Sequence, residues 1–122
     1  MQVCLYDASG ASQPLASMAL LPGGTCGTKP CWTASGTSTF KYGNKAGTPN
    51  GLMKAQFKAG LAGKPKISAS GKGVHLPLPS LPITLPVTVQ LLIDKGVTSQ
   101  CWQTPYSVAA TNTAAQFKAK GP

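Results

Sequence analysis

Hydrophobic and polar residues alternate most regularly in two neighbouring segments, residues 52–59 and 64–72. Alternation with a period of two predicts β-strands with one buried and one solvent-facing side. Asn50-Gly51 and the loop at 60–63 are turn signals, so we expect the two strands to form a hairpin. Its apolar side would carry Met53, Ala55, Phe57, Ala59, Ile67, Ala69 and Gly71. Its other side would gather five lysines on one solvated face: Lys54, Lys58, Lys64, Lys66 and Lys72.

A second hairpin is predicted around the turn sequence Asp94-Lys95-Gly96, which separates residues 87–93 from residues 97–102. Apolar residues recur at every second position of its first arm and would form a core face: Val87, Val89, Leu91 and Ile93. Weaker strand patterns occupy four further segments: residues 2–6, 17–21, 31–34 and 37–42. The whole set amounts to about eight short strands.

Strands of this number and spacing predict an all-β fold, an antiparallel β-sandwich of jelly-roll or immunoglobulin-like type with 7–8 short strands. Glu and Arg are absent, whereas 14 Gly and 11 Pro interrupt the chain, which disfavours helices. The Pro-rich segment 76–86 cannot donate a full ladder of hydrogen bonds, so we expect an edge or a crossover between sheets. Its prolines also break the longest apolar run, so no membrane span is expected.

The length of 122 residues predicts a single domain over residues 1–122 with one modest core. The first residues already have a strand pattern and lack the charged and apolar regions of an export signal. We therefore expect the chain to be a module of a larger exported protein, with any signal lying outside it.

Four cysteines, Cys4, Cys26, Cys31 and Cys101, permit three disulfide pairings. Cys26 and Cys31 flank a Gly-Thr-Lys-Pro turn and are predicted to close it, which leaves Cys4 to pair with Cys101. A zinc site is the rival interpretation, but the spacing is poor and His75 is the only imidazole, so no metal is expected. Disulfides would indicate an extracytoplasmic location, secreted or at the cell surface.

The charge is strongly one-sided, because all eleven basic residues are Lys and the only acids are Asp7 and Asp94. The resulting net charge of +9 attracts polyanions such as anionic glycans, wall polymers or nucleic acid without specifying which. The alternative is that the lysines only keep strand surfaces soluble.

Several short motifs occur in a characteristic order: Leu-Pro-Gly-Gly at 21–24, Cys-Trp at 31–32, Phe-Lys-Tyr at 40–42, the lysine-rich hairpin, Pro-Val-Thr-Val-Gln-Leu at 86–91 and Cys-Trp at 101–102. In this order the chain resembles a β-rich module from the C-terminal parts of large exported proteins of soil bacteria. The resemblance implies one or two further strands before position 1. It assigns no activity to any residue.

Few residues in this sequence have side chains suited to catalysis. One hydrolase hypothesis pairs His75 with Asp7 or Asp94 and a serine, in an esterase-like arrangement. Another uses Asp7 and Asp94 as the two carboxylates of a glycosidase, which must lie about 5 to 10 Å apart. Both aspartates precede turn-forming residues, so turn formation explains them without catalysis. No phosphate loop or dinucleotide motif is present, and no cofactor is expected.

Binding has better candidates. Trp32 and Trp102 each follow a cysteine on a predicted strand, so inward cysteines would turn the indoles outward, and Tyr42 could lie near them. Exposed aromatic side chains stack on sugar rings or bases. The alternative is that both tryptophans pack over disulfides as structural lids.

The leading hypothesis is a non-catalytic module that binds an anionic or neutral polysaccharide, or another surface polymer, through Trp32, Trp102, Tyr42 and the lysine-rich hairpin. Nucleic acid would bind only non-specifically. The small hydrolase is the alternative from another class. A third is a structural module that forms homodimers or larger assemblies by edge-strand pairing.

Overall fold

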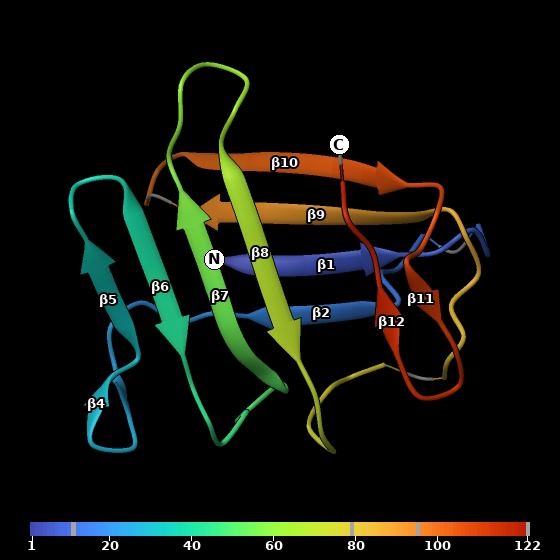
Figure 1. Ribbon diagram of the computed structural model, residues 1–122, viewed down its shortest axis with the longest axis horizontal. Coiled ribbons are helices and arrows are strands. Elements are labelled where there is room, and N and C mark those ends of the chain that lie inside the picture. The colour runs from blue at the N-terminus through green and yellow to red at the C-terminus, as the bar shows by residue number, and fades with distance from the viewer. Residues whose placement is uncertain (11, 79, 95, 122) are drawn as a thin grey trace. The chain divides into compact units, whose positions relative to one another are not determined.

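The structure is a computed structural model that describes residues 1–10, 12–78, 80–94 and 96–121. Among these residues none is helical, and all regular structure consists of antiparallel strands (Figure 1). The strands are β1 (Gln2–Tyr6), β2 (Ala16–Ala19), β3 (Thr25–Cys26), β4 (Lys29–Pro30), β5 (Trp32–Ser35), β6 (Thr39–Gly43), β7 (Leu52–Lys58), β8 (Lys66–Gly71), β9 (Val87–Asp94), β10 (Ser99–Tyr106), β11 (Thr111–Asn112) and β12 (Phe117–Lys118). The predicted all-β, antiparallel, disulfide-stapled class is confirmed.

The chain divides into two compact units. Unit 1 comprises Met1–Leu20 and Pro77–Pro122, and unit 2 comprises Leu21–Leu76. Each unit contains one four-stranded sheet, in the order β10-β9-β1-β2 in unit 1 and β5-β6-β7-β8 in unit 2. The single domain expected over residues 1–122 stays a prediction.

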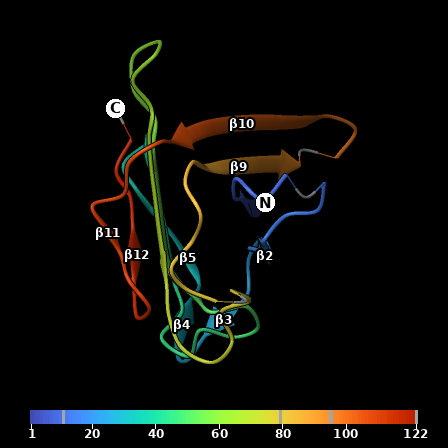
Figure 2. The ribbon, with the colours of Figure 1, turned by 90° about the vertical axis from the view of Figure 1, so that its right-hand side faces the viewer.

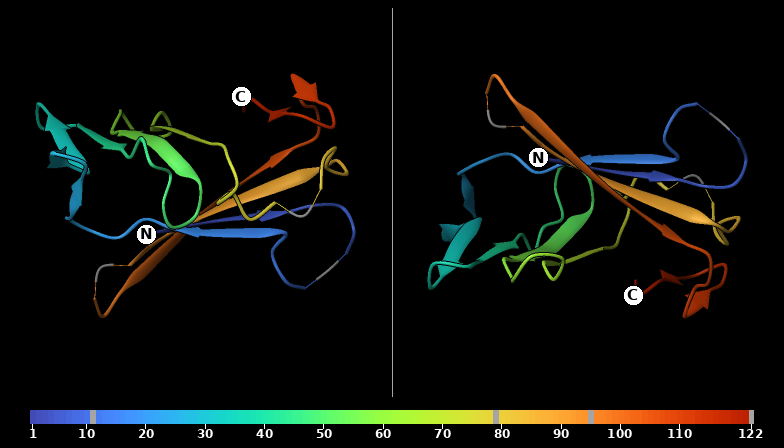
Figure 3. Two further views of the ribbon diagram at one scale, coloured as in Figure 1. Left: turned by 90° about the horizontal axis from the view of Figure 1, so that it is seen from below. Right: turned by 90° about the horizontal axis from the view of Figure 1, so that it is seen from above.

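The sheet of unit 1 is built around the predicted second hairpin, in which β9 and β10 pair over eight residues each (Figure 2). Figure 3 shows that successive strands of this sheet are rotated relative to one another, as the twist of L-amino-acid strands requires. Gly96 at the turn donates its backbone N–H to Asp94 Oδ1 (3.1 Å), while Lys95 lies outside the described residues.

One face of this sheet is apolar. Val3 lies opposite Met18 on one side and Leu91 on the other, and all three side chains are buried. The predicted core face of β9 is confirmed in register, and Val87 is fully buried. Burial of these side chains stabilises the fold by about 1.5–3 kcal/mol for each fully buried large aliphatic side chain.

The Pro-rich segment connects β8 to β9 and forms no strand in its described residues, which exclude Pro79. It is fixed in unit 1 by the side chain of Asn112 on β11. Asn112 Oδ1 accepts from the Ile83 N–H (2.9 Å) and Nδ2 donates to the Ile83 carbonyl (2.7 Å). The amide side chain thus replaces the strand partner that a Pro-rich segment lacks.

The cysteine prediction is half right. Cys26 and Cys31 form a disulfide in unit 2, whereas Cys4 and Cys101 are both free. The expected bridge between Cys4 and Cys101 is wrong because β9 lies between β1 and β10. Two strand spacings amount to roughly 10 Å, which exceeds the Cα separation of about 7 Å that a disulfide can span.

The sheet of unit 2 contains the predicted lysine-rich hairpin, since β7 pairs with β8 from Lys58 and Lys66 to Leu52 and Gly71. A β-bulge lies between Leu52 and Lys54, so Met53 has no partner of its own on β8. Leu52 and Ala55 are buried, and Phe57 is half-buried. The predicted alternation of burial is confirmed for β7 beyond the bulge, whereas it is wrong for β8, all of which is exposed, including Ile67, Ala69 and Gly71.

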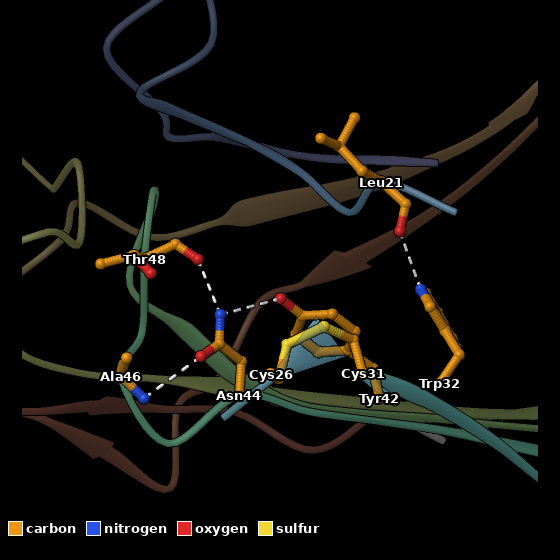
Figure 4. The surroundings of a disulfide bond; sticks show 8 residues. All are labelled: Leu21, Cys26, Cys31, Trp32, Tyr42, Asn44, Ala46 and Thr48. Atoms are coloured by element: carbon orange, nitrogen blue, oxygen red, sulfur yellow. Dashed lines mark hydrogen bonds between the residues drawn. A yellow bond between two sulfur atoms is a disulfide. The ribbon is translucent and has the colours of Figure 1, made fainter. Parts of the chain in front are cut away.

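The start of unit 2 is stapled by the disulfide and by one buried amide (Figure 4). Cys26 and Cys31 have Cα atoms 4.8 Å apart and close the short β3–β4 hairpin. Asn44 is buried, and its Nδ2 donates to the Thr48 carbonyl (2.7 Å) and to the Tyr42 hydroxyl (3.2 Å). Its Oδ1 accepts from the Ala46 N–H (3.2 Å), so the amide organises the loop after β6.

Candidate functional site

Four lysines lie on one face of the unit 2 sheet. The pairing register places Lys41 opposite Gln56, Lys54 opposite Ser70, and Lys58 opposite Lys66. Directly paired residues of antiparallel strands point to the same side of the sheet, so these side chains share a face. We call this surface the lysine face; it consists of Thr33, Ser35, Thr39, Lys41, Lys54, Gln56, Lys58, Lys66, Ser68 and Ser70.

Two further predicted lysines flank the face rather than lie within it. Lys64 precedes β8, in the loop where its N–H donates to the Leu61 carbonyl (2.8 Å), and Lys72 follows β8. Both are exposed. The predicted set is therefore extended along one hairpin, with Lys54, Lys58 and Lys66 on the sheet and the other two at its ends.

The electrostatics of unit 2 are unbalanced. Residues 21–76 contain eight lysines and no aspartate or glutamate, and all eight lysines are exposed. Lys58 and Lys66 stand directly opposite each other, an arrangement that destabilises a sheet because the like charges repel. A fold gains nothing from such a pair, whereas an anionic ligand would be attracted by it.

Lys41 is the member of the lysine face that the sequence analysis missed. Its strand pattern was visible in residues 37–42, but alternation within one strand does not show which neighbour it joins. The pairing of β6 with β7 is what brings Lys41 beside Gln56 and between Lys54 and Lys58.

The aromatic residues of unit 2 lie on the opposite side of the same sheet. Trp32 pairs with Tyr42, and Tyr42 pairs with Ala55, whose side chain faces away from the lysines. The ring centroid of Trp32 lies 5.2 Å from that of Tyr42 and 5.9 Å from that of Phe57. Trp32 is half-buried and Tyr42 is buried, and the indole N–H of Trp32 donates to the Leu21 carbonyl (2.9 Å; Figure 4). Trp32, Tyr42 and Phe57 therefore form a packed cluster. This cluster and the exposed Phe40 lie on the side of the sheet away from the lysines.

Trp102 belongs to unit 1, on the edge strand β10. It pairs with Leu91 and so shares the apolar face of that sheet, although half of its side chain remains exposed. Cys101 points to the other face, where Gln103 lies opposite Gln90 and accepts a hydrogen bond from it (3.1 Å). The expected order, with cysteine inward and indole outward, is thus reversed at this position.

A shallow depression adjoins the lysine face at the bulge of β7. It has a volume of about 290 Å³ and is lined by Met53, Lys54, Ser70, Gly71 and Lys72. The bulge explains its position, because an extra residue re-aims the neighbouring side chains. The sequence pattern predicts Met53 on the buried side of the strand, whereas in the structure it lines this depression.

The two aspartates are turn residues at opposite ends of the unit 1 sheet. Asp7 follows β1, next to the start of β9, whereas Asp94 ends β9. Seven residues of strand separate the two ends, roughly 23 Å, which is well beyond the spacing of a carboxylate pair in a glycosidase. The structure therefore does not bring these two candidate residues together.

Each aspartate has a local role instead. Asp7 accepts hydrogen bonds from the hydroxyl and from the backbone N–H of Ser9 (3.0 Å for the N–H), and these bonds lower the pKa of Asp7. Asp94 accepts from the Gly96 N–H. Both patterns are Asx-type turns.

His75 is exposed in the turn after β8. It belongs to unit 2, whose sequence offers no carboxylate to orient it as a catalytic base. In the described part of the chain, no group of three or more His, Cys, Asp or Glu residues is placed to hold a metal ion. Nor do the described residues include a helix with the length and apolarity needed to cross a membrane.

Comparisons with protein-family models, with curated proteins and with solved structures found no match for this chain. The geometry of the lysine face is therefore the main guide to function.

Proposed function

We propose that this protein is a non-catalytic, extracytoplasmic module that binds an anionic polysaccharide through the lysine face. The single observation that carries the proposal is the gathering of Lys41, Lys54, Lys58 and Lys66 on one sheet face, in a unit whose sequence contains no acid. The disulfide Cys26–Cys31 supports the location, since such bonds persist in oxidising compartments.

An anionic ligand is favoured over a neutral one by the placement of the aromatic rings. Neutral sugar rings are bound mainly by stacking on exposed aromatic faces. In unit 2, Trp32 and Tyr42 are engaged in a cluster on the other side of the sheet. The lysine face itself offers only ammonium, hydroxyl and amide groups, which suit charged and hydrogen-bonding ligands.

The remaining hypotheses receive less support. Hydrolysis would need carboxylates or a histidine in one place, and Asp7, Asp94 and His75 are distributed over two turns of unit 1 and one of unit 2. Edge-strand assembly would use an edge such as β8, but Lys64, Lys66 and Lys72 surround it with charges that oppose pairing with a second copy.

The test uses dextran sulfate, carboxymethyl-dextran and unmodified dextran of one chain length, with affinities measured at several salt concentrations. We expect the two anionic polymers to bind with an affinity that falls as salt rises, and dextran not to bind. The variant K41Q/K58Q/K66Q should lose about tenfold or more in affinity, because each exposed ion pair contributes up to about 1 kcal/mol.

A matched control removes the same charge elsewhere, as K29Q/K45Q/K118Q. These residues lie on β4, in the turn after β6 and on β12. We expect the control to retain affinity within about threefold. Equal losses for both triple variants would mean that only net charge matters, and the lysine face would then not be a site.

A further inference from the structure

We propose that the depression at the β7 bulge is a subsite for a tetrahedral oxyanion, the sulfate or phosphate ester group of an acidic polysaccharide. The inference rests on the proposed function and names the group that this end of the lysine face selects. The ester would lie among Lys54, Ser70 and Lys72, which line the depression together with Met53 and Gly71.

The three donor residues come from β7, from β8 and from the segment that follows β8. Lys54 and Ser70 are directly paired across the hairpin, and Lys72 lies just beyond the end of β8. Two ammonium groups and one hydroxyl supply several hydrogen-bond donors without any acid nearby in the sequence of unit 2. A volume of about 290 Å³ corresponds to the small end of ligand pockets, enough for one charged substituent and part of its sugar.

The backbone beneath these donors is held in place by two glycines. A Cβ atom on Gly51 would lie 2.6 Å from Leu76 Cα, and one on Gly71 would lie 2.6 Å from the Gly51 carbonyl oxygen. Gly51 also has a φ of +79°, and its carbonyl accepts from the Lys72 N–H (3.0 Å). Such close backbone contacts fix the Cα position of Lys72 before a ligand arrives, which reduces the entropy lost on binding.

The type of donor favours a tetrahedral group over a carboxylate. The forked guanidinium of Arg binds carboxylates and phosphates alike through two parallel hydrogen bonds, and this chain has no Arg. Lys and Ser each donate from one point, so three of them are matched by an anion whose oxygens point in several directions. Sulfate and phosphate esters have that shape, with three terminal oxygens, whereas a carboxylate has two oxygens in one plane.

The lysines outside the depression favour a polymeric ligand over a free anion. From Lys54, the strand β7 leads past Gln56 and the neighbouring Lys41 to the paired Lys58 and Lys66, roughly 14 Å away. A chain anchored by one ester in the depression would present its next charges to those lysines. The second contact is then intramolecular, which raises the overall affinity.

The experiment compares two double variants that lose the same charge from the same hairpin. K54Q/K72Q alters the depression, and K58Q/K66Q alters the far end of the lysine face. Both are tested against dextran sulfate and carboxymethyl-dextran of equal length and degree of substitution. We expect the native chain to prefer the sulfate by about tenfold, K54Q/K72Q to lose this preference, and K58Q/K66Q to bind both polymers more weakly with the preference unchanged.

The two proposals fail in different ways. If the native chain binds neither anionic dextran, the proposed function is wrong. If it binds both but the preference is absent, or is lost equally in the two double variants, only the subsite is overturned. Dextran phosphate is tested in a third arm. The ester group that the depression selects is the one whose dextran the native chain binds more tightly. A single-stranded oligonucleotide of equal charge that outcompetes both esters would overturn the polysaccharide as the source.

Discussion

The two units share one architecture and differ in what their sheets carry. Each has a four-stranded antiparallel sheet. Unit 1 contains both aspartates and three of the lysines, whereas unit 2 contains eight lysines and no acid. Buried apolar side chains follow the opposite trend among the described residues. They include Val3, Cys4, Ala16, Met18, Leu20, Ile83, Val87 and Leu91 in unit 1, against Cys31, Tyr42, Leu52 and Ala55 in unit 2.

This difference shows two ways of stabilising a small sheet. Unit 1 relies on apolar burial, with one continuous face of aliphatic side chains. Unit 2 adds a covalent staple, the hydrogen-bonded Asn44 and an aromatic cluster to a smaller set of buried residues. Because these interactions stabilise unit 2, the lysine face on the other side of the sheet can carry like charges that lower stability.

The largest expected effect comes from the core of unit 1. Leu91 is buried on the central strand β9, so L91A should lower the free energy of unfolding by about 3 kcal/mol through lost burial and the cavity left behind. Trp102 is the direct cross-strand neighbour of Leu91, and its fluorescence in a W32F background reports unit 1 during urea unfolding.

The matched control is V97A, because Val97 is fully exposed after the β9–β10 turn and its truncation should change stability little. Trp32 fluorescence in a W102F background reports unit 2. If L91A shifted the urea transitions of both reporters by the same amount, the two units would unfold together. Their stabilities could then not be compared separately.

The next effect concerns the staple of unit 2. Replacing both partners of the disulfide, C26A/C31A, should cost about 2 kcal/mol, the chain-entropy value for so short a loop. The Trp32 reporter should show the loss, and a reducing agent should reproduce it in the native chain. C101A is the control, because Cys101 is free and exposed. A comparable loss in C101A would mean that the loss in C26A/C31A does not come from the disulfide.

Much of this contrast was predictable from the sequence. Period-two alternation located both long hairpins, and the core face of β9 follows directly from its apolar positions. Strand ends differ by a residue or two, as for the segment predicted at 17–21 and found as Ala16–Ala19. The short spacing of Cys26 and Cys31 also sufficed to predict their bond.

What the sequence could not supply is the order of strands within each sheet. β9 lies between β1 and β10, which separates Cys4 from Cys101. The pairing of β6 with β7 adds Lys41 to the lysine face. The pairing of β5 with β6 places Trp32 on the opposite side of the sheet. The bulge at Met53 is likewise a product of pairing. Each depends on contacts between distant segments, which local periodicity does not encode.

A smaller effect tests whether the lysine face costs stability. K66E places a carboxylate opposite Lys58 and replaces repulsion with attraction, so unit 2 should gain about 0.5 kcal/mol while affinity for dextran sulfate falls. The Trp32 reporter in urea and a binding assay at one salt concentration measure the two changes. K118E, on β12 of unit 1, should leave the unit 2 transition unchanged. A loss of unit 2 stability in K66E would contradict the repulsion argument.

The smallest effect is a pH dependence confined to unit 1. Hydrogen bonds from Ser9 hold the pKa of Asp7 below its ordinary value of 3.8 in the folded chain. A lowered folded pKa stabilises the fold at pH values above the unfolded pKa, and this contribution disappears as the pH falls through the folded pKa. Between pH 5 and about pH 2, the Trp102 reporter should therefore record a slight loss of stability that D7N lacks and S9A reduces. Unit 2 has no carboxylate side chain to titrate in that range, so the Trp32 reporter should stay level; a matching step there would mean that acid acts on the two units alike.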